Sequence, residues 1–400
     1  MSDLDQPESP VASQPPTDIP VSVVPGEPSS TPETKPEKKP ADKPKGTFTK
    51  RQLIIASVAA GVIIISGTAL AFALHHKPAK TAVLVKKTVT PPPPTPAPTP
   101  TMVTDPVTGY LVTPAVAAQP VAGVMIENLY PYARPQSGLS QAGIVYEALA
   151  EGGITRFLAI FQQPFPGVMG PVRSLRPYYL DWGLERGIPI AHAGGSQPAL
   201  AEIVPLGLKN INALEYDGSY FYRISTRFAP HNLYTNSVNF TKLVAKLGFA
   251  TAPTFPALPR KDDAPAKVPE HTDIKIPFSY TAYNAEYKYN AAANDYLRFE
   301  GGAPQTDQNT GKQIEVKNLA VEFIPVSYGT QDDGDPFTNY HLIGSGKLLV
   351  FEDGNAIVGT WSKTADAAPT QLLDSNGNPI VFNRGNIWIS VVPTGTNVTY

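Results

Sequence analysis

The sequence predicts an α/β globular domain followed by a mostly antiparallel β domain, with a single N-terminal transmembrane helix ahead of both. Three observations lead to this fold class. An uncharged run of 22 residues spans Leu53 to Leu74. Strand-like and helix-like runs alternate between residues 118 and 250, as in α/β folds. Short β-rich runs around Asp-Gly and Asn-Gly pairs occupy residues 274–400, as in hairpins.

The first 117 residues divide into three segments. Residues 1–52 are rich in Pro, Ser, Thr, Glu and Lys, which predicts a disordered tail because such a segment can bury little apolar surface. Residues 53–74 are long enough to cross a hydrocarbon core of about 30 Å. Residues 75–117 include seven prolines between positions 91 and 100, which predicts an extended stalk.

Charges beside the apolar run predict how the chain is oriented in a membrane. Seven Lys and Arg residues lie between positions 35 and 51, against four between positions 77 and 87. An excess of positive charge marks the cytoplasmic side. We therefore expect a single-pass cell-membrane protein with a cytoplasmic N-terminus and its globular domains outside.

Composition narrows the chemistry. The net charge is −2, so nucleic acid is not expected as a partner. The chain has no cysteine, which excludes disulfides, thiolate metal sites and cysteine nucleophiles. Because no ligand spacing typical of a metal site is recognisable, we predict neither a metal nor a cofactor.

Three strands and three helices are expected within residues 118–250. Strands are predicted at 121–128, 155–163 and 188–196, and helices at 137–153, 174–187 and 197–204. Ser174 is a candidate N-cap of the second helix, with Pro177 in its first turn. The alternation predicts a largely parallel sheet, and in such sheets the loops after the strands carry the ligand site.

Residues 251–273 form the expected connector, and residues 274–400 the β-rich domain. Strand-like runs occur at 275–290 and 296–302. Residues 346–363 predict a hairpin around Asp353-Gly354, and residues 371–382 repeat this pattern around Asn376-Gly377. A closing strand is predicted at 386–393.

Arginine is the main chemical clue in the first domain. Seven of the eleven arginines lie between residues 120 and 250, where lysine occurs three times. Arginine in place of lysine favours fixed, bidentate contacts with oxyanions. The same span holds eight acidic residues, so pairing inside the chain could satisfy every arginine.

Glycines, serines and arginines gather at four predicted strand–helix junctions, where free backbone N–H groups favour an anion. These junctions are "RPQSG" (134–138), "GGITR" (152–156), "GPVRS" (170–174) and "GGS" (194–196). They predict a cleft for an anionic ligand, such as a cell-wall or other envelope component. The candidate ligand-binding residues are Arg134, Gln136, Ser137, Arg156, Arg173, Ser174, Arg176, Ser196, Arg223, Arg227 and Asn232.

Two further hypotheses remain open. An envelope hydrolase or transferase could use His192 or His231 as an acid–base group, assisted by Glu147 or Glu151. Against this, Glu151 would pair with Arg156 or Arg173 as part of an ion-pair network. A protein–protein scaffold, with the β domain as the contact surface, is the third hypothesis, and its protein partners are unknown.

Several long stretches resemble one bacterial family. They include "GVMIENLYPYARPQSGLSQAGIVYEALAEGGITRFLAIF", "GPVRSLRPYYLDW", "APHNLYTN" and "GSGKLLVFEDGNAIVGTWSK". In these the chain resembles the YerB-like lipoprotein family over roughly residues 118–395. The resemblance implies a two-domain envelope protein of unassigned biochemical function and brings no catalytic residues. Many members are anchored through a lipidated cysteine, which this chain lacks, and the apolar run 53–74 would take its place.

Overall fold

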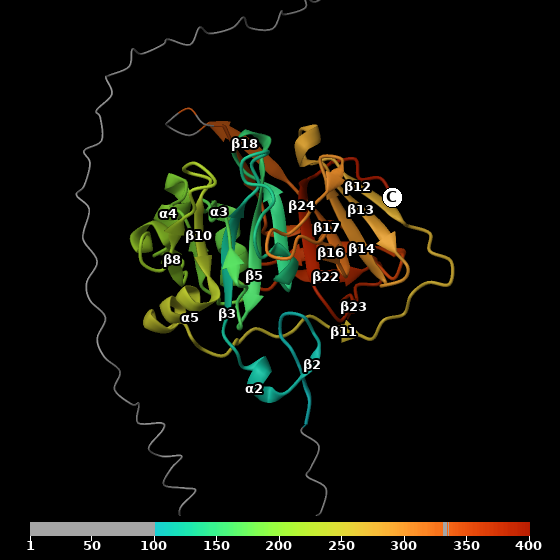
Figure 1. Cartoon of the computed structure of the whole chain (residues 1–400). Helices are drawn as coiled ribbons and strands as arrows, with labels where there is room; N and C mark the ends of the chain where they lie inside the picture. Colours follow the sequence, from blue (N-terminus) through green and yellow to red (C-terminus); the bar gives the residue numbers. More distant parts are fainter. Residues whose placement is uncertain (1–100, 331–333, 335) are drawn as a thin grey trace, which may run out of the picture. The chain divides into compact units, whose positions relative to one another are not determined.

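A computed structural model of the chain describes residues 101–330, 334 and 336–400 (Figure 1). The predicted tail 1–52, the predicted membrane helix 53–74 and residues 75–100 of the stalk lie outside these ranges. The described residues belong to one compact unit, Thr95–Tyr400. No helix in the described ranges is long and apolar enough to cross a membrane.

A ten-stranded sheet forms the centre of this unit, in the order β22-β21-β20-β17-β24-β4-β5-β3-β7-β8. From the first half of the chain come β3 (Val121–Glu127), β4 (Ile144–Leu149), β5 (Thr155–Gln162), β7 (Ile190–His192) and β8 (Asn210–Asn212). From the second half come β17 (Asn318–Ile324), β20 (Gly344–Glu352), β21 (Asn355–Lys363), β22 (Gln371–Asp374) and β24 (Ile387–Pro393).

Strand β24 joins the two halves of the chain into this one sheet (Figure 1). It pairs in parallel with β17 on one side and with β4 on the other, so that Ile389 lies opposite both Ala320 and Tyr146. The closing strand predicted at 386–393 is therefore confirmed, but its assignment to an antiparallel set is wrong. As a result, the α/β part and the β part of the chain share a continuous sheet.

The helix predicted at 137–153 is wrong. These residues form a 3₁₀ turn at Leu139–Gln141, the strand β4 and a second 3₁₀ turn at Glu151–Gly153. Every residue of β4 is buried. A strand that is covered on both faces does not alternate polar and apolar residues, so its apolar positions can match a helical stripe by coincidence. Glu147 and Glu151 consequently do not share a helix face.

The other elements of the first half follow the predictions more closely. The helices are α2 (Pro114–Ala117), α3 (Pro177–Leu184), α4 (Gln197–Glu202) and α5 (Ser237–Lys246). The helices predicted at 174–187 and 197–204 are confirmed with shorter bounds. Helix α3 begins at Pro177 with Arg176 as N-cap, because proline suits the first helical position, where an N–H group is not needed. The prediction that Ser174 caps this helix is wrong.

The three predicted strands of the first half are confirmed, but their directions are mixed. β7 runs parallel to β3 and β8, whereas β5 runs antiparallel to both β3 and β4. Between β4 and β5 the chain has only residues 150–154, and a parallel crossover needs a dozen residues or more. This short connection makes β4 and β5 antiparallel, and with β3 and β5 also antiparallel the sheet is mixed, not largely parallel as predicted.

Smaller sheets surround the central one. One contains β12 (Asp273–Ile276), β13 (Ala285–Asn290), β14 (Asp295–Glu300), β15 (Ala303–Pro304) and β16 (Glu315–Val316). Another contains β6 (Val168–Met169), β9 (Tyr222–Arg223) and β10 (Leu233–Asn236). Three pairs complete the set: β1 (Val103–Thr104) with β2 (Leu111–Val112), β11 (Arg260–Lys261) with β23 (Phe382–Asn383), and β18 (Val326–Thr330) with β19 (Pro336–Tyr340).

The hairpin predicted around Asp353-Gly354 is confirmed. β20 and β21 pair along nine residues each, and both turn residues have positive φ values of 57° and 76°. Glycine reaches such angles without strain, and Asp is among the few other residues that do so. The pattern around Asn376-Gly377 also folds back, but only as an isolated bridge between Leu373 and Pro379.

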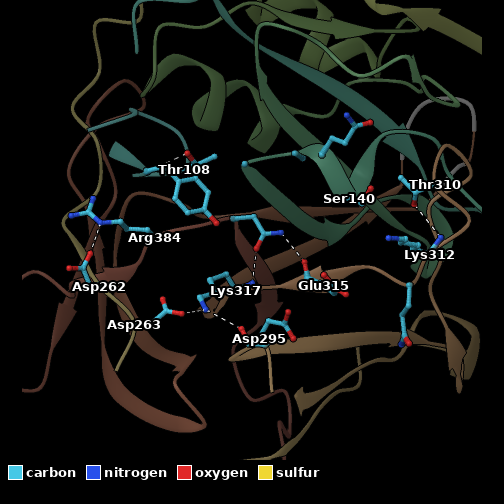
Figure 2. A pocket seen from close by; sticks show the side chains of 17 residues that line it. Thr108, Ser140, Asp262, Asp263, Asp295, Thr310, Lys312, Glu315, Lys317 and Arg384 are labelled. Atoms are coloured by element: carbon cyan, nitrogen blue, oxygen red, sulfur yellow. Dashed lines mark hydrogen bonds and ion pairs between the residues drawn. The ribbon is translucent and has the colours of Figure 1, made fainter. Parts of the chain in front are cut away.

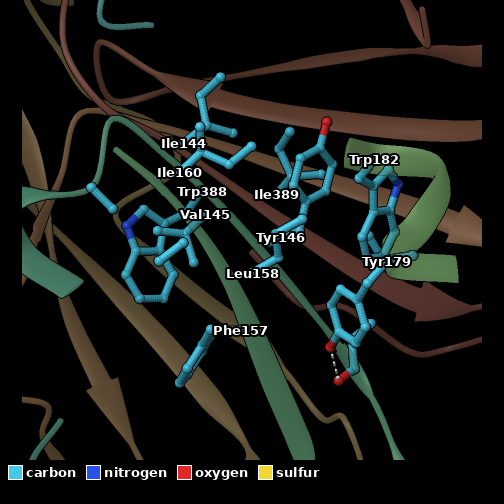
Figure 3. Close-up of a cluster of buried hydrophobic side chains, with 14 of the residues drawn as sticks. Ile144, Val145, Tyr146, Phe157, Leu158, Ile160, Tyr179, Trp182, Trp388 and Ile389 are labelled. Atoms are coloured by element: carbon cyan, nitrogen blue, oxygen red, sulfur yellow. Dashed lines mark hydrogen bonds between the residues drawn. The ribbon is translucent and has the colours of Figure 1, made fainter. Parts of the chain in front are cut away.

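The core lies on both faces of β4 and β24 (Figure 3). On one face the ring of Tyr146 stacks on Trp182 of α3 at 4.5 Å between centroids. On the other face Val145 lies beside Trp388, whose ring is covered by the guanidinium of Arg298 from β14. The central sheet is thus covered by α3 on one side and by the β12–β16 sheet on the other.

Candidate functional site

The predicted junctions lie together at the end of β3. Backbone bridges join Ser137 to Gly170, Ile126 to Val172 and Leu175 to Gly195. The stretches "RPQSG", "GPVRS" and "AHAGGS" are therefore neighbours in the fold. Their arginines could face either a ligand or carboxylates of the chain itself.

Six of the seven arginines between residues 120 and 250 are paired with carboxylates of the chain itself. The pairs are Arg134–Glu300 at 3.1 Å, Arg156–Glu151 at 2.5 Å, Arg173–Glu127 at 3.0 Å, Arg176–Glu151 at 2.5 Å, Arg186–Glu185 at 3.0 Å and Arg223–Asp217 at 2.7 Å. A guanidinium removed from water needs such a counter-charge. The predicted cleft lined by many open arginines is therefore not formed by these six side chains.

Glu151 is clamped between two arginines. Its two oxygens accept hydrogen bonds from Arg156 and Arg176, whose other nitrogens donate to the carbonyl oxygens of Ser174 and Leu175. The two guanidinium groups hold the pKa of this carboxyl at about 2, although burial opposes them. The expected pair Glu151–Arg156 is confirmed, whereas Arg173 binds Glu127 instead. Such a clamped carboxylate is a structural group rather than an acid–base assistant.

Arg134, Gln136 and Glu147 belong to a buried network between the two halves of the chain. Arg134 and Gln136 both donate to the Asn128 side chain, at 2.9 and 2.7 Å. Glu147 is fully buried and accepts a hydrogen bond of 2.8 Å from Arg298. Burial raises the pKa of Glu147 even though Arg298 opposes the change. This network stabilises the junction and leaves Glu147 inside the protein, away from solvent.

His192 is a buried residue of β7. Its Nδ1 lies 2.7 Å from the carbonyl oxygen of Gly194, and its Nε2 lies 2.5 Å from the side-chain oxygen of Asn210. Burial lowers its pKa. Since both ring nitrogens are engaged within the fold, neither is available to exchange a proton with a substrate.

His231 has a different environment. Its Nδ1 lies 2.9 Å from Oε1 of the buried Glu127, and the same oxygen is 3.0 Å from Nε of Arg173. The imidazole stacks on Tyr132 at 5.6 Å and meets the edge of Phe228 at 5.1 Å. These two aromatic rings are exposed. A carboxylate at Nδ1 fixes the orientation of the imidazole, as in hydrolytic triads.

Ser174, Ser196 and Asn232 have local structural contacts. Ser174 donates to the carbonyl oxygen of Ala193 at 3.1 Å, and Ser196 precedes α4 without a capping hydrogen bond. The Asn232 side chain accepts from Arg223 at 3.0 Å. It also donates to the carbonyl oxygens of Ile224 and Arg227, which fixes the loop that carries Arg227.

Arg227 is the exception among the seven arginines, because within the described residues it has no carboxylate partner. Its Nη1 donates to the carbonyl oxygen of Ala133 and to the hydroxyl of Tyr234, at 2.8 and 2.7 Å. Its Nη2 donates to the carbonyl oxygen of Pro135 at 2.7 Å. These neutral acceptors orient the guanidinium without cancelling its charge.

Arg227 lines a cavity of about 1080 Å³, here named the Arg227 cleft. Ser137, also a predicted site residue, lies in the same wall. The lining residues are Ser137, Gln141, Gly167, Val168, Tyr222, Ile224, Thr226, Arg227, Tyr234, Gln308, Asn309 and Thr310. Arg227 is the one charged side chain among them. Of the predicted site, the structure therefore brings Arg227 and Ser137 to a cleft.

A second cavity, of about 740 Å³, is here named the junction groove (Figure 2). Ser140, Thr310 and Lys312 lie at one end, and Asp262, Asp263 and Arg384 lie at the other. Asp295, Glu315 and Lys317 lie between these ends. Sequence reasoning missed these residues because most of them come from the connector, from β14 and from the turns near β16, which carry no motif. The adjacent acids in "KDD" (261–263) were the available signal.

Comparison with known proteins places the chain in a family. Residues 107–250 match the model described as the DUF3048 N-terminal domain, and residues 274–389 match that of the DUF3048 C-terminal domain, both of a protein of unknown function. The gap between the two matched ranges coincides with the connector predicted at residues 251–273.

A relative and a solved structure extend this match. YerB of Bacillus subtilis (strain 168), which is named as a candidate lipoprotein, is 35% identical over 293 residues, or 72% of this chain and 86% of the relative. The crystal structure of the YerB protein from Bacillus subtilis is similar with a TM-score of 0.66 and 31% identity. That match covers 74% of this chain and 100% of the crystallised one. The chain therefore belongs to the YerB-like (DUF3048) family, a family of unknown function.

Proposed function

We propose that this protein is a membrane-tethered, extracytoplasmic envelope protein that binds an anionic ligand in the Arg227 cleft. One observation carries the proposal: the guanidinium of Arg227 has no carboxylate partner in the described residues and lines a cavity of about 1080 Å³. A cation in a cleft with an otherwise uncharged lining favours an anion from solution.

The hydrogen bonding of Arg227 leaves room for such a ligand. A guanidinium has five N–H groups. Three are engaged by Ala133, Pro135 and Tyr234, so the Nε–H and one Nη2–H remain. Two adjacent N–H groups match the two oxygens of a carboxylate or a phosphate.

The rest of the lining indicates what carries the anionic group. Tyr222, Thr226, Gln308 and Asn309 offer hydroxyl and amide groups that donate and accept hydrogen bonds without charge. Sugars and polyols present many hydroxyl groups of matching character. The ligand class that fits best is a sugar or polyol bearing a carboxylate or a phosphate, as in envelope polymers.

The membrane part of the proposal rests on the sequence and on one relative. Residues 53–74 are predominantly apolar and carry no charge, the flanking charges favour an outer C-terminal part, and the Bacillus relative is named as a candidate lipoprotein. Protease added to cells whose wall has been removed but whose membrane is intact should digest residues 101–400. Protection of these residues in intact cells, with digestion only after lysis, would contradict the outward orientation.

Calorimetry on the full chain in a polyoxyethylene detergent tests ligand binding. The probes are glucuronic acid, a carboxylate on a sugar, and glycerol 3-phosphate. We expect binding of at least one probe, and we expect Arg227→Gln to weaken it about tenfold or more because a charge-assisted pair is lost. Lys288→Gln is the charge-matched control: Lys288 is exposed, pairs with Glu286 and lines neither cavity, so its loss should leave the affinity unchanged. Equal affinity in the Arg227→Gln variant would refute the site.

A hydrolase is the second candidate function, and the Glu127–His231 pair favours it. The carboxylate engages Nδ1, which leaves Nε2 of this largely buried imidazole as the nitrogen that would act as a base for water. If the protein hydrolyses phosphate or glycosidic bonds of an envelope polymer, His231→Asn should abolish product release and Glu127→Gln should reduce it. Release that is unchanged in His231→Asn would remove this candidate. His192, Glu147 and Glu151 are no longer candidate acid–base groups, because each of them is engaged by contacts inside the fold.

A further inference from the structure

The Arg227 cleft and the junction groove share two lining residues. Gln141 and Thr310 belong to both cavities. Both residues are exposed, so the boundary that the two cavities share lies at the protein surface and not in the core. The two cavities, of about 1080 and 740 Å³, are therefore adjacent on the protein surface. A single small-molecule site typically has about 300–1000 Å³, so their combined space exceeds what one small ligand needs.

The two parts differ in the sign of their unbalanced charge. In the Arg227 cleft the unbalanced charge is positive. In the junction groove, Arg384 is neutralised by Asp262 at 2.9 Å, and Lys317 is neutralised by Asp263. Within the described residues no ion pair neutralises Asp295, Glu315 or Lys312, which leaves two acids against one base. The net surplus in the junction groove is therefore negative.

Asp295 is the side chain that most needs a cation. It lies at the start of β14 and is 8% exposed, and its Oδ1 is buried without a hydrogen-bond partner in the described residues. A buried carboxylate oxygen without a donor is costly. Burial raises the pKa of Asp295 and the neighbouring Glu315 raises it further, whereas a hydrogen bond with Asn290 and the charge of Lys317 lower it. Because Lys317 is already paired with Asp263, a further ammonium group placed between Asp295 and Glu315 would offset their mutual repulsion.

We propose that the two cavities form one groove for a linear polymer that carries an anionic group and, further along, a primary amine. The anionic group would bind at Arg227, and the ammonium group would bind at Asp295 and Glu315 in the middle of the junction groove (Figure 2). The polymer would cross from one part to the other over Gln141 and Thr310. This inference rests on the proposed anion site and adds the length and the second charge of the ligand.

The crossing point is held firmly, as a groove for an extended ligand requires. Asp307 is buried and accepts hydrogen bonds from the backbone of Gly138, Ser140 and Asn309. It thereby ties the turn that carries Gln141 to the turn that carries Thr310. The two sides of the groove come from the N-terminal and C-terminal family regions, so the groove exists only when both are present.

Matched oligosaccharides test the inference. The probes are a hyaluronan hexasaccharide, which is anionic only, and its partly N-deacetylated form, which adds ammonium groups. Glucuronic acid is the short anionic control. With the full chain in a polyoxyethylene detergent, we expect the deacetylated probe to bind about tenfold more tightly than the acetylated one. Equal affinity for the two hexasaccharides would overturn the inference.

Two sets of variants locate the effect. Asp295→Asn with Glu315→Gln should remove the advantage of the deacetylated probe and leave glucuronic acid binding unchanged. Glu202→Gln with Glu215→Gln removes two exposed acids elsewhere and should preserve the advantage. If the advantage survives in Asp295→Asn with Glu315→Gln, the amine does not bind there and the inference fails.

Gln141→Trp tests the continuity of the groove. The exposed position tolerates a larger side chain, which would obstruct the passage between the two cavities. Both hexasaccharides should bind more weakly, while glucuronic acid should bind as before. Unchanged hexasaccharide binding would show that the ligand does not cross at this point. Arg227→Gln separates the two proposals: if it leaves every probe unaffected, the anion site itself fails, whatever the acidic residues do.

Discussion

Charge pairing decides the role of each arginine in the first half of the chain. Residue counts show that eight acids could satisfy seven arginines, but they do not show which pairs form. Glu151 and Arg156 are close in sequence, and that pair could be predicted. Arg134 pairs with Glu300, far along the chain, and this contact depends on the tertiary fold. For the same reason, the sequence could not show that Arg227 has no carboxylate partner in the described residues, because this depends on the tertiary contacts of all the acids.

Glu151→Gln gives a prediction on pH. The folded pKa of about 2 lies below the usual unfolded value of about 4.3, so the charged carboxylate contributes stability above pH 4.3. This contribution, of about 3 kcal/mol at most, is lost as the pH falls from about 4.3 to 2. Urea unfolding should therefore show a large difference between the parent and Glu151→Gln at pH 6 and a small one near pH 2.

Glu202→Gln is the control for this measurement. Glu202 is exposed on α4 and should change the stability little at either pH. A difference between the parent and Glu151→Gln that stays constant from pH 6 to pH 2 would show that the clamp by Arg156 and Arg176 does not depend on the carboxylate charge.

At the level of elements, local patterns predicted the strands and turns that carry their own signals. The Asp353-Gly354 hairpin follows from two residues that accept positive φ, and β3 and β5 follow from their apolar runs. Strand β4 failed because both of its faces are covered, which removes the alternation that identifies a strand. The same error misplaced Glu147, which was expected in the helix at 137–153 and lies in the buried strand β4 instead.

Gly170→Ala tests how the segments around the Arg227 cleft support one another. Gly170 has φ near 148°, and a Cβ there would lie 2.6 Å from the ring of Tyr234, which in turn accepts a hydrogen bond from Arg227. We expect a loss of about 1–3 kcal/mol in unfolding free energy, together with weaker glucuronic acid binding. Thermal unfolding and calorimetry measure the two effects.

Gly167→Ala provides the matched comparison, because a Cβ at Gly167 would meet nothing within 4 Å. It should keep the parent stability within about 0.5 kcal/mol. If the unfolding free energy of Gly170→Ala equals that of Gly167→Ala, then the close approach of Gly170 to Tyr234 does not exclude a Cβ.

For the whole molecule, the shared sheet has a consequence for cooperativity. The family regions at 107–250 and 274–389 look like separate domains in the sequence, yet β24 pairs with strands of both. The network of Glu147, Arg298 and Glu300 crosses the same boundary. This union could not be predicted, because a strand pattern does not specify its neighbours. We expect the two regions to unfold together.

Trp388→Ala tests this cooperativity. The Trp388 ring is fully buried in β24 beneath Arg298, and its loss should cost about 3–5 kcal/mol. Hydrogen exchange should then speed up by a similar factor in β3 and β5 of the first region and in β17 and β20 of the second. Val358→Ala, at an exposed position of β21, should leave the exchange rates of both regions unchanged. Faster exchange confined to the second region would show that the regions unfold independently.

The central claim is that Arg227 holds an anionic ligand, and its side-chain N–H signal reports this most directly. In the full chain labelled with [¹⁵N]arginine, titration with glucuronic acid should shift the Nε–H resonance of Arg227 to saturation. The Nε–H resonance of the buried Arg298, which donates to Gln305, should stay in place. A saturable shift at Arg227 alone is the result that this account predicts. Saturable binding that leaves the Arg227 resonance unmoved would contradict it.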